Sequence, residues 1–98
     1  MGEERIHTLV LAIECRIHHA QSLKQKRAAI KSVIERLRAR LNASVAEVGY
    51  LDEWQHSLIG IAMVSNNRRY LQQQSDLVEQ LLLEATDIEI IHIESHWP

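Results

Sequence analysis

The succession of two hydrophobic periods along the chain is the feature that most constrains its fold. Residues 6–17 carry apolar side chains at alternate positions, as in a strand with one buried face, and short apolar or β-branched runs predict further strands at 45–50, 58–64 and 88–93. Helical spacing appears at residues 23–41, after a capping box of Ser22 and Gln25, and again up to residue 85, after a cap at Ser65 or Asn66. The predicted order is strand, helix, strand, strand, helix, strand.

This order predicts a particular topology, because both helices are long enough to cross from one end of a sheet to the other. Right-handed crossovers place them on the same side of one antiparallel sheet. We therefore expect an α+β ferredoxin-like βαββαβ sandwich, formed by residues 1–98 as a single domain, since 98 residues suffice for one core and not for two. In this fold the first and third strands are central, and one sheet face is left uncovered.

Composition and targeting signals indicate where such a domain acts. Apolar residues make up 46% and charged residues 24% of the chain, which is typical of a globular domain. Cys15 is the single cysteine, so an internal disulfide and a paired-cysteine zinc site are both excluded. The longest uncharged apolar stretch, residues 58–64, is far shorter than the ~20 residues of a membrane helix, and no signal peptide is recognisable. We expect a cytoplasmic protein with no membrane partner.

Well-known uses of the ferredoxin-like fold need site residues that this chain lacks. RNA-recognition domains stack bases on aromatic residues of the central strands, and the first and third predicted strands carry none. A phosphate cradle needs glycine and arginine after the first strand, where residues 18–22 read His-His-Ala-Gln-Ser. A copper site in this loop needs two cysteines. We predict no catalytic residues, no cofactor and no small-molecule substrate, and thus a protein that is not an enzyme.

Six histidines suggest a metal site, but their spacing argues against one. His92 and His96 share a strand face yet lie ~13 Å apart, which is too far for a single ion. Cys15 alternates with the core residues of the first strand, and this position predicts a buried, unreactive thiol. We expect no native metal site.

Positive charge is concentrated in one segment of the chain. Residues 16–41 hold eight basic residues and a single acid, Glu35, a balance of +7 in a chain whose net charge is −2. On a helical wheel one flank of the apolar arc carries a basic stripe about 20 Å long, formed by Lys24, Arg27, Lys31 and Arg38. Arg36 and Arg40 lie on the opposite flank. The stripe has the form of a phosphate-binding surface, and the alternative is a solvated helix face.

The uncovered sheet face is a second candidate surface. Its middle combines Val10 and Ala12 with either Gly60 and Ala62 or their odd-numbered neighbours. A flat, partly apolar face of this kind favours sheet-to-sheet association of two copies. Val10, Ala12 and the hairpin residue Trp54 are therefore the predicted interface residues of a homodimer.

Three blocks of sequence resemble the small bacterial YlxP-like family, whose function is unknown. They are HAQSLKQKR at residues 19–27, SVAEV at 44–48 followed by Trp54-Gln55, and GIAMVSN at 60–66. The resemblance implies a ferredoxin-like fold and a gene common among those of translation and ribosome-maturation factors, and it implies no activity. The chain departs from the usual family pattern at His18-His19 and at residues 96–98.

The first of these blocks places cations directly after the capping residue. Cations near a helix N-terminus oppose the helix dipole by roughly 0.3 to 1 kcal/mol each, and a bound anion or a nearby acid such as Glu47 would offset this. We predict a homodimeric accessory module that touches RNA or the ribosome through Lys24, Lys26, Arg27, Lys31 and Arg38. The alternative is a protein-interaction or scaffold module whose basic stripe is only solvated.

Overall fold

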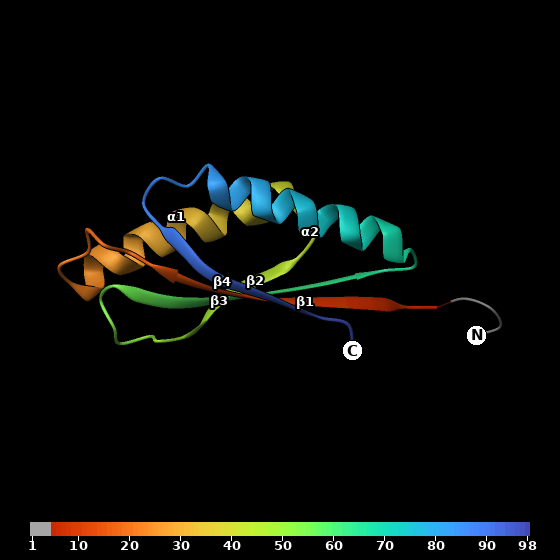
Figure 1. Cartoon of the computed structure of the whole chain (residues 1–98), viewed down its shortest axis with the longest axis horizontal. Helices are drawn as coiled ribbons and strands as arrows, with labels where there is room; N and C mark the ends of the chain where they lie inside the picture. The colour runs from red at the N-terminus through yellow and green to blue at the C-terminus, as the bar shows by residue number, and fades with distance from the viewer. Residues whose placement is uncertain (1–4) are drawn as a thin grey trace.

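The computed structural model describes residues 5–98 and contains the predicted elements in the predicted order (Figure 1). The strands are β1 (His7–Arg16), β2 (Ser44–Gly49), β3 (His56–Ser65) and β4 (Glu89–His96), and the helices are α1 (Leu23–Arg40) and α2 (Arg68–Leu83). The strands form one antiparallel sheet in the order β2-β3-β1-β4, and both helices lie on one side of it (Figure 1). The predicted ferredoxin-like fold is confirmed.

Hydrogen bonds of two polar side chains determine where α1 begins. Ser22 Oγ accepts a hydrogen bond from the Gln25 backbone N–H at 3.1 Å, and the Gln25 side chain accepts one from the Gln21 N–H at 2.7 Å. The first helical turn leaves backbone donors without intrahelical partners, and a reciprocal cap of this kind satisfies two donors at the helix start. The predicted capping box is therefore present, with Gln25 reaching one residue further back than usual.

The start of α2 and the end of β4 differ from the prediction. Asn67 caps α2, because its Oδ1 accepts a hydrogen bond from the Tyr70 N–H at 3.2 Å. Ser65, one of the predicted caps, instead accepts a hydrogen bond from the Asn67 N–H at 3.1 Å. β4 extends to His96 rather than residue 93, because its pairing with β1 continues until His96 lies opposite Val10.

The register between β1 and β3 determines which side chains share the open sheet face. Val10 lies opposite Ala62, and Ala12 lies opposite Gly60. Side chains alternate along a strand, so the even-numbered residues of both strands face away from the helices. Of the two sets left open by the sequence, the one with Gly60 and Ala62 is correct.

The helix-facing side of the sheet forms one apolar core with the inner sides of both helices. Core members include Leu9, Leu11, Ile13, Cys15, Ile30, Val33, Leu37, Ile59, Ile61, Met63, Leu71, Val78, Leu81 and Leu82.

None of the helices described in residues 5–98 is long and apolar enough to cross a membrane.

Three loops meet at one end of the sheet, on the left in Figure 1. They are the β1–α1 loop (residues 17–22), the β2–β3 loop (50–55) and the α2–β4 loop (84–88). The first two are joined directly, because the Ile17 N–H donates a hydrogen bond to the Gln55 carbonyl at 3.1 Å. We call this region the three-loop end.

Candidate nucleic-acid interface

The surface of α1 is strongly basic. Glu35 is the only acid in the helix, and six of the seven cations are exposed. Lys31 Nζ lies 3.9 Å from Glu35 Oε1, and an exposed pair of this kind contributes about 0.3 to 0.5 kcal/mol, so it holds the lysine only weakly. The exposed cations are Lys24, Arg27, Lys31, Arg36, Arg38 and Arg40.

Three residues of the predicted stripe border a groove between α1 and the edge strand β2. This α1 groove has a volume of about 330 Å³ and is lined by Arg27, Ile30, Lys31, Ile34, Glu35, Arg38, Ala46 and Glu47. Arg38 Nη2 donates a hydrogen bond to the Val45 carbonyl at 2.6 Å, which holds the guanidinium beside β2. The structure therefore brings Arg27, Lys31 and Arg38 together, with two carboxylates among them.

Lys26 does not belong to this surface, and its prediction as an RNA-binding residue is wrong. Its side chain is fully buried, and its ammonium forms an ion pair with Glu47 and donates a hydrogen bond to the Tyr50 carbonyl at 2.9 Å. Ser57 Oγ donates a further hydrogen bond to Glu47 at 2.7 Å. An ammonium with these partners is unavailable to a phosphate, whereas Glu47 as an internal partner is confirmed.

Cys15 lies beside this buried polar cluster and faces the core. Burial raises the pKa of the Cys15 thiol to about 11, the nearby Glu47 carboxylate raises it as well, and the Lys26 ammonium acts in the opposite direction. The thiolate is the nucleophilic form of cysteine, so this side chain stays protonated and unreactive near neutral pH. The prediction of a buried thiol in the core is confirmed.

The middle of the open sheet face is shallow and apolar. Val10 lines a hollow there together with Val48, Gly60 and Ala62, and Ala12 lies opposite Gly60 in the register. Val48 and Val64 are 56% and 64% exposed, respectively. The face thus presents apolar side chains to solvent over β1, β2 and β3.

Trp54 lies away from this apolar middle. It belongs to the β2–β3 loop, where it lines a separate hollow with Arg16 and His56. The structure therefore does not bring together all three predicted interface residues, since Val10 and Ala12 occupy the centre of the face and Trp54 its three-loop end.

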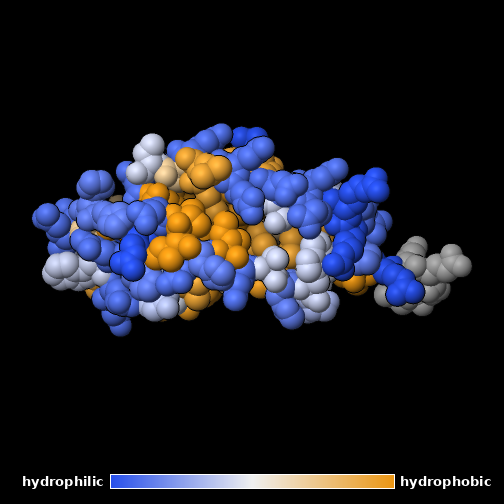
Figure 2. All heavy atoms as spheres, in the orientation of Figure 1, coloured by the Kyte–Doolittle hydropathy of each residue, from blue (hydrophilic) through white to orange (hydrophobic). Residues whose placement is uncertain are grey.

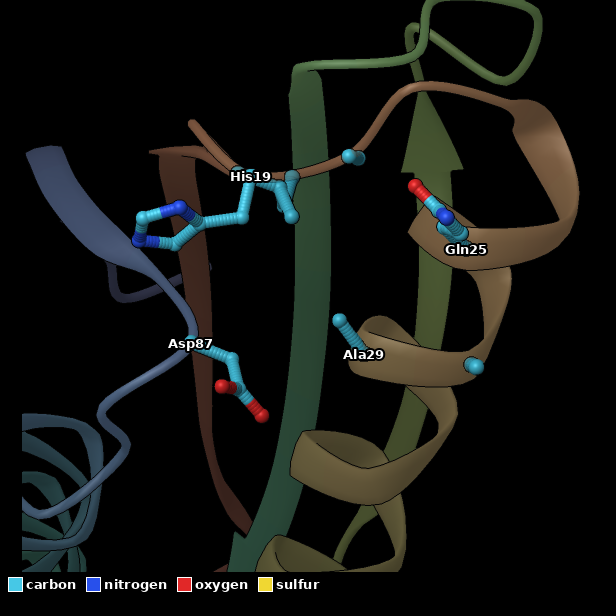
Figure 3. Close-up of a pocket in the computed structure, with 7 residues that line it drawn as sticks. His19, Gln25, Ala29 and Asp87 are labelled. Carbon is cyan, nitrogen blue, oxygen red and sulfur yellow. The ribbon is translucent and has the colours of Figure 1, made fainter.

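A further hollow opens on the helix side of the three-loop end (Figure 3). It has a volume of about 390 Å³ and a partly apolar lining that includes Ile17 and Ala29. His19 and Asp87 line it from two loops, opposite Gln25 and Ala29 of α1 (Figure 3). An apolar area also lies where the chain passes from α2 into β4 (Figure 2).

Among residues 5–98, no three histidine, cysteine or acidic side chains are grouped so that they could hold a metal ion.

The sequence analysis missed one polar cluster on the open face. His56 Nε2 lies 2.6 Å from Glu14 Oε2, and the His56 ring stacks on Tyr50 with a centroid distance of 3.7 Å. Glu14 and His56 are 42 residues apart, and only the β1–β3 register places them diagonally across the two strands. The alternation along β1 places Glu14 on the open face, but the identity of its partner depends on a register that the sequence does not provide.

Fold and surface together define a class of protein: a small ferredoxin-like α+β domain with a basic helix face and an uncovered sheet. The chain belongs to the family described as "Protein of unknown function (DUF503)", whose model matches residues 8–95. It is 36% identical over 84 residues to "Uncharacterized protein YlxP" of Bacillus subtilis (strain 168), an alignment that covers 86% of this chain and 91% of that protein. The YlxP-like resemblance is thus confirmed.

Similarity to solved structures concerns the fold alone. The de novo designed protein Foldit4 matches with a TM-score of 0.57 at 12% sequence identity, over 91% of this chain and 96% of that one. At this identity the match supports the ferredoxin-like topology and carries no information on function.

Proposed function

We propose that this protein is a non-enzymatic accessory module of the cytoplasm that binds RNA, free or in ribosomal particles, through the basic face of α1. One observation carries the proposal: a single helix exposes six cations and one acid, while the chain as a whole has a net charge of −2. Positive charge that served only solubility would not have to be concentrated on one helix. Clustering on one face is typical of a phosphate-binding surface.

The geometry of the stripe supports contact with a nucleic-acid backbone. Residues 24–38 of a helix extend over about 20 Å, which spans several phosphates of one strand. Lys24 and Arg27 also lie in the first two turns of α1, where they oppose the helix dipole. A bound phosphate would offset this opposition. Among residues 5–98, Lys26 is the one cation in the first two turns of α1 that has an acidic partner.

A pair of charge-matched variants tests the proposal. Arg27→Gln/Lys31→Gln removes two cations from the α1 groove, and Arg36→Gln/Arg40→Gln removes two from elsewhere on the same helix. Binding of a structured ribosomal RNA fragment would be measured between 50 and 200 mM salt, because each phosphate contact contributes about 0.7 to 0.9 to the slope of log affinity against log salt. The first variant should bind more weakly, with a slope shallower by about 1.4 to 1.8, while the second retains most of the affinity.

Two results would contradict the proposal. RNA binding by the unmodified protein could be undetectable at 50 mM salt, where electrostatic contacts are strongest. Alternatively, the two variants could lose affinity equally, which would indicate general attraction between charges and not a defined surface.

A second candidate function rests on the open sheet face: a protein-interaction or scaffold module that acts as a homodimer without nucleic acid. The observation that favours it is the exposure of Val48, Val64 and Ala62 beside Val10. Two such faces packed together would remove these side chains from water. The open face and the basic face of α1 lie on opposite sides of the sheet, so a homodimer formed through the open face would leave the basic face accessible.

A further inference from the structure

The open sheet face ends, at the three-loop end, in a hollow that neither the basic helix nor the apolar sheet centre includes. It has a volume of about 370 Å³ and is lined by Arg16, Glu53, Trp54, Gln55 and His56. We call it the hairpin hollow. Its lining combines an indole, an imidazole, a guanidinium and a carboxylate, all groups that take part in ligand recognition.

The loop that carries Trp54 is held from both sides. The Tyr50 carbonyl at its start accepts a hydrogen bond from buried Lys26 at 2.9 Å, and Gln55 at its end donates bonds to the His18 and Ala20 carbonyls at 3.1 and 3.0 Å. Trp54 is nevertheless 54% exposed. A large ring kept in water on a restrained loop loses little conformational freedom on binding, and this is the property of a preorganised contact residue.

The wall of the hollow is also held in place. His56 is ion-paired or hydrogen-bonded to Glu14 at 2.6 Å and stacks on Tyr50. Tyr50 has a φ of 56°, a left-handed conformation that is uncommon for a bulky residue and that costs of order 1 kcal/mol or more. Strained backbone conformations are frequent at binding sites. Here the strained residue is Tyr50, whose ring stacks on the His56 ring that lines the hollow.

The charges of the hollow restrict what it can bind. The lining contains one cation, Arg16, and one anion, Glu53, so neither a free phosphate nor an organic cation finds a site of purely opposite charge. A neutral, planar group with polar edges fits better. It can stack on the indole, donate from its edge to the Glu53 carboxylate, and place an attached phosphate near Arg16.

We propose that the hairpin hollow binds an unpaired nucleobase of single-stranded RNA, with the base stacked on Trp54 and the neighbouring phosphate contacted by Arg16. This inference rests on the proposed function and adds the kind of RNA: a strand or loop with bases free to stack. Lys24 is exposed at the first turn of α1, which begins at the same three-loop end. The hairpin hollow and the first turn of the basic helix thus share one end of the molecule.

Fluorescence of Trp54 provides the test. Trp97→Phe leaves Trp54 as the only tryptophan, and stacking of a base should quench its emission when a short single-stranded RNA is added. An RNA duplex of the same length should bind with little quenching. Trp54→Leu keeps an apolar side chain but removes the large π-face, and should weaken single-strand binding roughly 10- to 100-fold, by the same factor at 50 and 200 mM salt. Trp54→Phe should restore most of the affinity.

Leu51→Ala is the matched control for the loop. Leu51 is 51% exposed in the same loop but does not line the hollow, so its removal should leave single-strand affinity unchanged. Circular dichroism of each variant would establish that the fold is retained.

The possible failures are distinguishable. If RNA binds but Trp54 is not quenched, and Trp54→Leu binds as tightly as the unmodified protein, the hairpin hollow is not a base site and the proposed function stands. If no RNA binds at 50 mM salt, both proposals fail. A shift of Trp54 emission that depends on protein concentration alone, without a response to RNA, would identify the loop as a self-association surface and overturn this inference.

Discussion

At the scale of single residues, Lys26 shows where charge alone misleads. It stands between Lys24 and Arg27 in the sequence, and its charge suggested a surface position. Its spacing from Ile30, Val33 and Leu37, however, is four, seven and eleven residues, which places it on the buried side of the helix. The position of Lys26 on the helical wheel could therefore have identified it as a buried residue. The ion pair with Glu47 then stabilises its charge in the core.

The buried ion pair leads to a stability prediction. Lys26→Met should lower the free energy of unfolding by about 3 kcal/mol, because it leaves the Glu47 carboxylate without its cation. Lys26→Met/Glu47→Gln should recover part of the loss, since it removes the remaining charge. Urea denaturation would measure both. Lys24→Met, on the exposed side of the same helix, should leave stability unchanged or slightly higher, because it removes a cation that opposes the helix dipole. An equal loss in this control would contradict the assignment.

Cys15 leads to a prediction about alkaline pH. The pKa of its thiol is raised by burial from 9.0 to about 11 in the folded protein, so the folded state favours the protonated form. The corresponding stability is fully present below pH 9 and is lost as the pH rises through 11, by about 2 to 3 kcal/mol. Lysine and tyrosine also titrate in this range. The measurement is therefore the difference in slope between the unmodified protein and Cys15→Ala, which should lose less stability between pH 9 and 11.

At the scale of elements, α1 was the most predictable part of the chain. Its cap, its apolar side and the flank occupied by Arg27, Lys31 and Arg38 all follow from local spacing. The start of α2 and the end of β4 were less predictable. Three polar residues in succession, 65–67, were each suitable as a cap, and the length of β4 depends on how far β1 offers it a partner.

Removal of the α1 cap should have a measurable and local effect. Ser22→Ala deletes the oxygen that accepts the Gln25 N–H, and loss of such a cap costs about 1 kcal/mol. Ser32→Ala is a suitable control, because Ser32 is exposed in the middle of α1 and alanine has the higher helix propensity. Thermal unfolding should show a lower midpoint for the first variant and an unchanged or higher one for the second. Equal midpoints for both would show that the cap is dispensable.

At the scale of the whole molecule, the sheet topology could be deduced from the order of elements, whereas the register could not. The alternation of side chains along the first strand placed Val10 and Ala12 on one face. The contacts of His56 with Glu14 and with Tyr50, in contrast, depend on how the strands pair. The hairpin hollow was unpredictable for the same reason. It combines the end of β1 with a loop almost forty residues later, and no local pattern records that proximity.

The open face leads to a prediction of assembly. We expect light scattering at micromolar concentration to give twice the 11.3 kDa mass of one chain. Val10→Glu should shift the protein toward monomer, because it places a charge in the centre of the apolar face. Leu83→Glu is the matched control, since Leu83 is 83% exposed on α2 and thus on the other side of the sheet. A single-chain mass at every concentration, or equal effects of both variants, would exclude a dimer through this face.

The arrangement of β1 and β4 also has a practical consequence for biosensor work. The strands run antiparallel with Val10 opposite His96, so the start of β1 and the end of β4 lie at the same end of the sheet. The three-loop end, with Trp54 and the start of α1, lies at the other end. A protein coupled to a chip through either of these strand ends therefore presents the three-loop end to the solution.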